Sequence, residues 1–367
     1  MHPDRDTAGV EMGRSTVPVS SEWPSRPVSE DGPSQSAVGL SSGAVRTRLY
    51  RDGRLIKENF PAHEIADELT HRHGCVVWLD LYEPSQEQLK LVGDVFGLHR
   101  LAVEDAVEDT QRTKIDRYGN HLFMAAYSAA IDEESGELET HEVGAFITHH
   151  ALVTVRKEGF DIDPVVARWD ASEDLARYGV SFLLYGLLDY LVDGHFRAVE
   201  TLDQAVEDTA DGLFDTGPKT IDRVQRRSFQ LRKSLVLLRR VALPTREVVN
   251  TLLRHELDYV PEPMAPYFHD IYDHVIRATE WTESLRDLVT TIVETNLTNQ
   301  GNRMNLIMKK VTSWAAIIAV PTAITGWYGQ NIPYPGFDSH AGLIVSTVLI
   351  VGISVGLFVM FRRKDWL

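Results

Sequence analysis

The segment Gly329-Gln330-Asn331 places several neutral hydrogen-bond acceptors near the C-terminal end of the chain. Two amide side chains and the backbone carbonyls supply the oxygens, and glycine lets a backbone turn and approach a ligand closely. A group of neutral acceptors of this kind can hold a hydrated cation through its bound waters. Taken alone, Asn331 fits a helix C-cap better, since asparagine adopts the left-handed conformation readily.

Two long apolar runs flank this segment, at residues 311–328 and 341–361. Neither contains a charged side chain, and each is long enough to cross the hydrocarbon core of a bilayer as a helix. Lys309 and Lys310 precede the first run, and a basic cluster at 362–364 follows the second. The positive-inside rule therefore predicts that both termini are cytoplasmic. Such a hairpin fits a plain membrane anchor as well as a transport function.

The charge of the chain is unevenly distributed. The formal net charge is −16, while residues 301–367 contain six Lys/Arg and two Asp/Glu, so the rest of the chain carries −20. An acidic body of this kind attracts cations and repels nucleic acid, although acidity also serves simply to keep a domain soluble. The single cysteine, Cys75, excludes an intrachain disulfide and suits a cytoplasmic domain.

The pattern of apolar residues predicts a mixed N-terminal part followed by long helices. Residues 1–44 contain few large apolar side chains and are predicted to be disordered. We predict strands at 76–81, 121–128, 142–148 and 151–156, helices at 86–96, 98–108, 182–210 and 221–240, and a helix end at Pro244. Residues 267–328 are compatible with one continuous helix of roughly 90 Å, because Pro321 is their only proline and a membrane helix tolerates it.

Several motifs in order along the chain resemble the CorA family of magnesium and cobalt transport proteins. Tyr328-Gly329-Gln330-Asn331 resembles the Gly-Met-Asn signature of that family, where a tyrosine precedes the motif at the outer end of the first of two terminal spans. The final Trp-Leu after a basic run is also typical of the family. Residues 97–105, 111–114 and 267–274 resemble its Leu-His-x-Leu-x-x-Glu-Asp, Gln-Arg-Pro-Lys and Tyr-Phe-x-Asp-x-x-Asp-His segments, with Thr113 in place of the proline.

The resemblance covers residues 45–367 and implies a fold. We expect an α+β cytoplasmic domain, a long stalk helix and two C-terminal transmembrane helices, assembled as a homopentameric, funnel-shaped channel in the cell membrane. The expected parts are a disordered tail at 1–44, an α/β domain at 45–179, cytoplasmic helices at 180–266, the stalk at 267–310, transmembrane helices at 311–328 and 341–361 with an extracellular loop at 329–340 between them, and a basic cytoplasmic tail at 362–367.

The resemblance also implies roles for particular residues. Gly329, Gln330 and Asn331 would form the selectivity filter, in which Gln330 replaces the methionine of the family. The first span would line the pore, and its small or polar side chains at helical spacing equally suit helix packing. The expected pore-lining residues are Asn305, Met308, Thr312, Ala315, Ala319, Thr322 and Gly326.

A second implied site is regulatory. Asp105 and Asp270 correspond to carboxylates that bind Mg²⁺ between subunits, and Glu104 and Asp189 correspond to a second metal site nearby. Carboxylates are the hard oxygen ligands that Mg²⁺ prefers. Without the resemblance, Asp270 is more simply a solvated side chain on a helix.

The function that these expectations favour is a channel for Mg²⁺, with Co²⁺ or Ni²⁺ as further substrates, gated by cytoplasmic Mg²⁺. Two alternatives stay open: a Zn²⁺ transporter similar to ZntB, and a membrane-tethered metal sensor that does not conduct. An enzyme is not expected, because the sequence has no nucleophile–base set, no phosphate-binding glycine loop and no cluster of zinc ligands.

Overall fold

The structure of the chain is a computed structural model. It describes residues 45–71, 74–108, 112–132, 136–214, 218–254, 258–330, 333 and 339–367. The tail at 1–44, for which disorder is predicted, lies outside the described residues.

Seven strands form one mixed sheet in the order β2-β1-β3-β7-β6-β5-β4. Among the strands of the described residues, only β3 and β7 pair in parallel. Both read as nearly continuous apolar runs, as expected of parallel strands covered on both faces. The strands are β1 Val45–Arg51, β2 Arg54–Glu58, β3 Cys75–Tyr82, β4 Lys114–Arg117, β5 Leu122–Ile131, β6 Leu138–Ile147 and β7 Ala151–Arg156.

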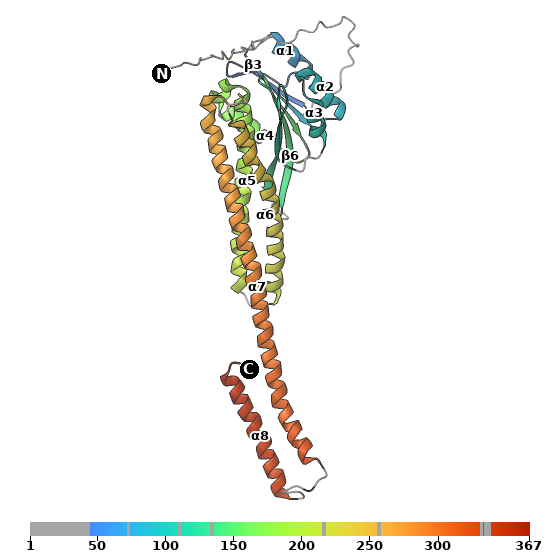
Figure 1. Cartoon of the computed structure of the whole chain (residues 1–367), viewed down its shortest axis with the longest axis vertical. Helices are drawn as coiled ribbons and strands as arrows, with labels where there is room; N and C mark the ends of the chain where they lie inside the picture. The colour runs from blue at the N-terminus through green and yellow to red at the C-terminus, as the bar shows by residue number, and fades with distance from the viewer. Residues whose placement is uncertain are drawn as a thin grey trace, which may run out of the picture. The chain divides into compact units, whose positions relative to one another are not determined.

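Helices cover both faces of the sheet. One face packs against α1 (Ile65–His71), α2 (Gln86–Phe96) and α3 (Arg100–Val107), around the buried side chains of Leu79, Leu89 and Phe146. The other face packs against α4 (Asp163–Ala171) and α5 (Val180–Asp211), as Figure 1 shows. The 3₁₀ turns are η1 Ala62–Glu64, η2 Glu173–Tyr178, η3 Gly212–Phe214 and η5 Glu262–Met264.

Helix α5 continues beyond the sheet and packs with α6 (Pro218–Leu252) and α7 (Ala265–Tyr328) around an apolar core. Helix α7 contains 64 residues, so it is about 95 Å long and extends well past the other two (Figure 1). Helix α8 (His340–Arg363) lies beside the C-terminal part of α7, where Trp314 contacts Phe358 with ring centroids 6.5 Å apart. The prediction of one long helix ending at Tyr328 is confirmed.

Pro244 does not end a helix, contrary to the sequence prediction. It lies inside α6, which continues to Leu252. A proline removes one backbone hydrogen bond from a helix interior. Here the helix continues because the residues on both sides are buried in the core, among them Ala242 and Val248, and their burial offsets the lost hydrogen bond.

Candidate functional site

The candidate filter begins at the C-terminal end of α7. The Gly329 amide donates to the Thr325 carbonyl at 2.8 Å, and the Gln330 amide donates to the Trp327 carbonyl at 3.3 Å. Both residues are exposed. The C-cap of α7 is Gly329, in the right-handed conformation. Asn331 lies outside the described residues, so its predicted contact with the ion remains a prediction.

The seven expected pore-lining residues all lie on α7, and all are exposed in the single chain. Helix α8 contacts a different part of the α7 surface, through Trp314, and Ser313 beside it is buried. The stripe of small and polar side chains that begins at Asn305 is therefore not covered by α8. It is available for contact with other copies of the chain or with a pore.

The C-terminal helices expose many large apolar side chains. Trp327, Leu343 and Val348 are examples, each more than half exposed. Among the described residues, α8 and the helical segment ending at Tyr328 are the two that are long and apolar enough to span a membrane. A surface of this kind needs a lipid or protein partner, and the helix lengths fit the bilayer.

Asp105 on α3 forms an ion pair with a lysine of the same chain. The Lys114 ammonium lies 2.5 Å from the Asp105 carboxylate and 3.1 Å from that of Asp116. Burial lowers the pKa of Lys114, but the hydrogen bonds to these two carboxylates outweigh it, and the net pKa shift is upward. Glu104, the neighbouring candidate ligand, is paired with Arg100 at 3.0 Å.

Asp189 on α5 is also paired with a basic side chain. Arg168 of α4 donates to Asp189 and, at 2.5 Å, to Asp193. Burial raises the pKa of Asp189, and the Arg168 guanidinium opposes that shift. Asp270 of α7 is close enough to Asp189 to raise its pKa further. The structure therefore brings Asp189 and Asp270 into one electrostatic neighbourhood, where Arg168 already supplies positive charge.

Asp105 does not complete this group within one chain. Helix α3 packs on the opposite face of the sheet from α5, and no three His, Cys, Asp or Glu side chains form a metal-binding group in the described part of the chain.

Arg168 is the residue near this site that the sequence prediction missed. It lies on α4, a helix that the sequence analysis did not anticipate. The signal was present in Asp163-Pro164, because an acidic residue followed by proline is typical of the first turn of a helix.

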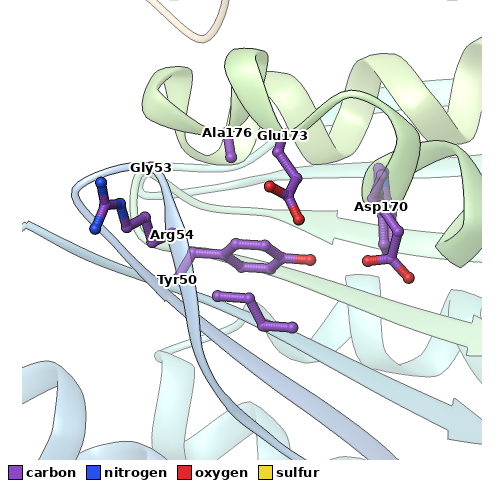
Figure 2. Close-up of a pocket in the computed structure, with 8 residues that line it drawn as sticks. Tyr50, Gly53, Arg54, Asp170, Glu173 and Ala176 are labelled. Atoms are coloured by element: carbon purple, nitrogen blue, oxygen red, sulfur yellow. The ribbon is translucent and has the colours of Figure 1, made fainter.

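A cavity of about 440 Å³ lies elsewhere, between the β1–β2 hairpin and the segment from α4 to η2. Figure 2 shows the carboxylates of Asp170 and Glu173 near the Tyr50 ring, with Arg54 at the opposite side. Arg48, buried next to it, donates to Asp170 at 2.6 Å and to Glu58 at 2.8 Å. None of the predicted site residues lines the cavity, and the ion pair with Arg48 explains Asp170 as part of the fold.

Comparison with known proteins identifies the family. The model of the family described as "CorA-like Mg2+ transporter protein" matches residues 74–363. The chain is 32% identical over 279 residues to the cobalt/magnesium transport protein CorA of Thermotoga maritima, which covers 75% of this chain and 79% of that protein. It is 33% identical over 294 residues to the putative metal ion transporter YfjQ of Bacillus subtilis, which covers 79% of this chain and 89% of that protein.

The fold agrees with a solved structure. The complete structure of the CorA magnesium transporter from Methanocaldococcus jannaschii superposes with a TM-score of 0.70 at 22% identity, over 88% of this chain and 99% of that one. The α/β domain, the long stalk helix and the two apolar C-terminal helices are thus those of the CorA fold. On the family match and the identities together, the chain belongs to the CorA-like Mg²⁺ transporter family.

Proposed function

We propose that the chain is one subunit of a homopentameric channel that conducts divalent cations into the cytoplasm. Mg²⁺ is the proposed main substrate, with Co²⁺ and Ni²⁺ as further substrates. The proposal rests mainly on the continuity of α7. This one helix of 64 residues connects the three-helix bundle, where Asp270 lies, to Gly329 and Gln330. A continuous helix can transmit a change near Asp270 to the pore without an intervening hinge.

In this proposal, the exposed stripe of α7 lines the pore. A single chain with two spans cannot enclose a pore, so several copies must surround an axis with this face turned inward. The residues along it are small or uncharged, so a hydrated cation passes without meeting a fixed positive charge. Both termini are cytoplasmic in this proposal, which Lys309, Lys310 and the basic cluster at 362–364 support through the positive-inside rule.

At the outer end of the pore, copies of Gly329-Gln330-Asn331 form the filter. Their carbonyl and amide oxygens accept hydrogen bonds from the waters that surround the ion, so Mg²⁺ enters with its hydration shell. Gln330 adds an amide at the position where the family signature has methionine, which makes the ring of acceptors larger. The preference among Mg²⁺, Co²⁺ and Zn²⁺ depends on this substitution.

In this proposal the channel closes when cytoplasmic Mg²⁺ binds the regulatory carboxylates. Asp105 of one subunit and Asp270 of the next, with Glu104 and Asp189 nearby, hold cytoplasmic Mg²⁺ at the subunit interface. Bound Mg²⁺ neutralises their mutual repulsion and locks the subunits together, and its loss at low concentration loosens them. The site therefore acts as a feedback switch, because the transported ion closes its own path.

The test of this proposal is the substitution Asn331→Ala in the full-length protein. If the chain forms a channel, the rate of divalent-cation uptake should fall at least tenfold. Removing one well-placed polar contact from every subunit weakens ion binding by about 1.4 kcal/mol or more. Ser339→Ala, in the same connector, is the matched control and should retain uptake. Normal uptake by Asn331→Ala would contradict the proposed filter, and no uptake by the wild-type protein would favour the tethered metal sensor.

A further inference from the structure

The three long helices present two different outer flanks. Helix α7 contacts α5 through Trp281 and Phe196, whose ring centroids are 5.6 Å apart, and it contacts α6 through Glu283 and Arg239 at 3.0 Å. Figure 1 shows α5, α6 and α7 running alongside one another. Each of α5 and α6 therefore has one side that turns away from the other.

The outer flank of α6 combines apolar and basic side chains. Gln225, Phe229, Arg232, Val236 and Arg240 are all exposed, and their spacing places them on one stripe of the helix. Phe229 is 72% exposed, more than any other large apolar residue that the structure describes, and Val236 is 52% exposed. Arg232 forms no ion pair with any described residue. We call this stripe the α6 flank.

The outer flank of α5 is acidic. Asp193, Glu200, Asp203, Glu207 and Asp211 follow one another at spacings of three, four or seven residues, so they too share one stripe. Within the described part of the chain, Glu200, Asp203 and Glu207 form no ion pair. We call this stripe the α5 flank. Its carboxylates repel one another unless cations cover them.

The two flanks lie at matching heights along α7. The contacts of Trp281 and Glu283 place the residues near Glu200 on α5 level with those near Arg239 on α6. Two helical turns closer to the α5–α6 connection, Arg232 is level with Asp203 and Glu207. A cyclic assembly rotates each copy about the axis without shifting it along the axis, so groups at one height meet.

An apolar contact is available at the same height as Phe229. Asn296 of α7 donates to the Ile221 carbonyl of α6 at 3.5 Å. Counting eight residues back along α7 from this contact reaches Leu288, and counting eight forward along α6 reaches Phe229. Leu288 is 42% exposed and lies one heptad after Trp281, so it faces the α5 side of α7.

We infer that the α6 flank of one copy docks on the α5 flank of the next copy, with Arg232 against Asp203 and Glu207, and Phe229 against Leu288. The inference rests on the proposed homo-oligomer. Because the two flanks differ, the contact is head-to-tail, and repeating it around an axis produces a ring. Desolvated pairing of basic and acidic groups fixes the register between neighbouring copies.

The same arrangement agrees with the placement of the regulatory carboxylates. The Thr113 hydroxyl donates to the Val241 carbonyl at 3.3 Å, so α6 lies beside the strand that carries Lys114, the partner of Asp105. The rings of Tyr185 and Tyr267 lie 5.4 Å apart, so the part of α5 that carries Asp189 packs beside the part of α7 that carries Asp270. Docking α6 on the next α5 therefore turns the Asp105 side of one copy toward the Asp189 and Asp270 side of the next.

Cross-linking of the full-length protein tests the contact. Arg232→Cys and Asp203→Cys are combined in a Cys75→Ala background and treated with a short bismaleimide cross-linker in lipid nanodiscs. We expect a ladder of covalent species up to the complete ring, and no ladder from either single variant. Lys90→Cys with Asp203→Cys is the matched control and should give no ladder, because Lys90 is an exposed residue of α2 on the other face of the sheet.

Native mass measurement and cation uptake, performed on the same samples, separate this inference from the proposed function. A ring that conducts divalent cations but gives no ladder would overturn the α6–α5 contact and leave the channel intact. A monomeric mass would overturn both. As a second variant pair, Arg232→Glu should weaken the ring, and adding Asp203→Arg should restore it. Failure of the second substitution to restore the ring would also count against the contact.

Discussion

At the scale of single residues, the notable feature is that the candidate regulatory carboxylates already have basic partners in the same chain. Lys114 pairs with Asp105, and Arg168 pairs with Asp189 and Asp193. Both arrangements partly neutralise the charge that would attract a metal ion. A metal that binds Asp105 or Asp189 must compete with these ammonium and guanidinium groups, which sets the Mg²⁺ concentration at which the proposed switch acts.

The substitution Lys114→Gln tests this competition. Removing a positive charge 2.5 Å from Asp105 should lower the Mg²⁺ concentration for half-maximal protection from thermolysin by on the order of tenfold. Thermolysin is suitable because its cleavage does not depend on lysine. Lys233→Gln, which removes an exposed lysine paired with Glu137, is the control and should leave the concentration unchanged. An unchanged or higher value for Lys114→Gln would show that Lys114 does not compete with Mg²⁺.

The buried ring of His195 should make the stability of the fold depend on pH. Its ring is buried, with Nε2 2.8 Å from the Tyr127 carbonyl, and burial lowers its pKa to about 4 from an ordinary value of 6.5. The unfolded chain therefore takes up the proton first, so stability is lost as the pH falls from about 7 toward 4. The loss at pH 5 is about 2 kcal/mol from this group.

Thermal unfolding of the full-length protein at pH 7.5 and pH 5 measures this effect. His195→Gln should show a smaller decrease in unfolding temperature between the two pH values than the wild type. His63→Gln, at an exposed position, should behave as the wild type. An equal decrease for His195→Gln and the wild type would show that His195 is not the group responsible.

At the scale of elements, the contact between α4 and α5 leaves no space for an added methyl group. A Cβ atom at Gly186 would lie 2.5 Å from Nε1 of Trp169, which is buried and donates to the Leu183 carbonyl at 3.1 Å. Gly186→Ala should therefore lower the free energy of unfolding by about 2 kcal/mol. Thermal or chemical denaturation of the full-length protein measures the change.

Gly301 provides the matched comparison for that substitution. It lies in α7, and an added Cβ would meet no atom within 4 Å. Gly301→Ala should leave stability unchanged or raise it by up to about 1 kcal/mol, because alanine favours the helix. If Gly186→Ala were as stable as Gly301→Ala, the described packing of Trp169 on α5 would be wrong.

Most of the elements follow from the sequence, including the short strands β3 and β7, but some, such as β1, do not. Helix α2 is predicted at 86–96 from its helical spacing and from Pro84-Ser85 before it, and the structure adds a capping box between Ser85 and Gln88. Strand β1 was missed because its alternation contains arginine, and Arg48 is buried through its ion pairs with Asp170 and Glu58. Tertiary packing stabilises strand β1 and lets α6 continue past Pro244, and sequence periodicity does not reveal such packing.

The candidate site was predictable only in part. The positions along α7 follow from helical spacing, and the structure leaves all of them exposed. The ion pairs of Asp105 and Asp189 join residues nine and twenty-one positions apart in sequence, so only the fold reveals them. The proposed contacts between α6 of one copy and α5 of the next cannot be predicted from the periodicity of a single chain.

At the scale of the whole molecule, charge is sorted along the chain in a way that suits cation entry. Residues 1–300 carry a net charge of −20, the two apolar C-terminal spans are uncharged, and basic residues stand at 309–310 and 362–364. In the proposed ring, the acidic part provides the regulatory sites and the α5 flanks, and the neutral stripe of α7 provides the path. Regulation then belongs to the N-terminal part of α7 and the helices packed against it, and conduction belongs to the C-terminal part of α7.

The most direct test is ion flux through the purified full-length protein in liposomes under an imposed membrane potential. Mg²⁺, Co²⁺ and Zn²⁺ are compared, with a proton gradient as the control driving force. We predict that Mg²⁺ enters when the potential is imposed, and that entry stops when Mg²⁺ is present on the cytoplasmic side. Zn²⁺ flux without Mg²⁺ flux would contradict the proposed substrate, and no flux of any divalent cation through a correctly assembled oligomer would contradict the channel itself.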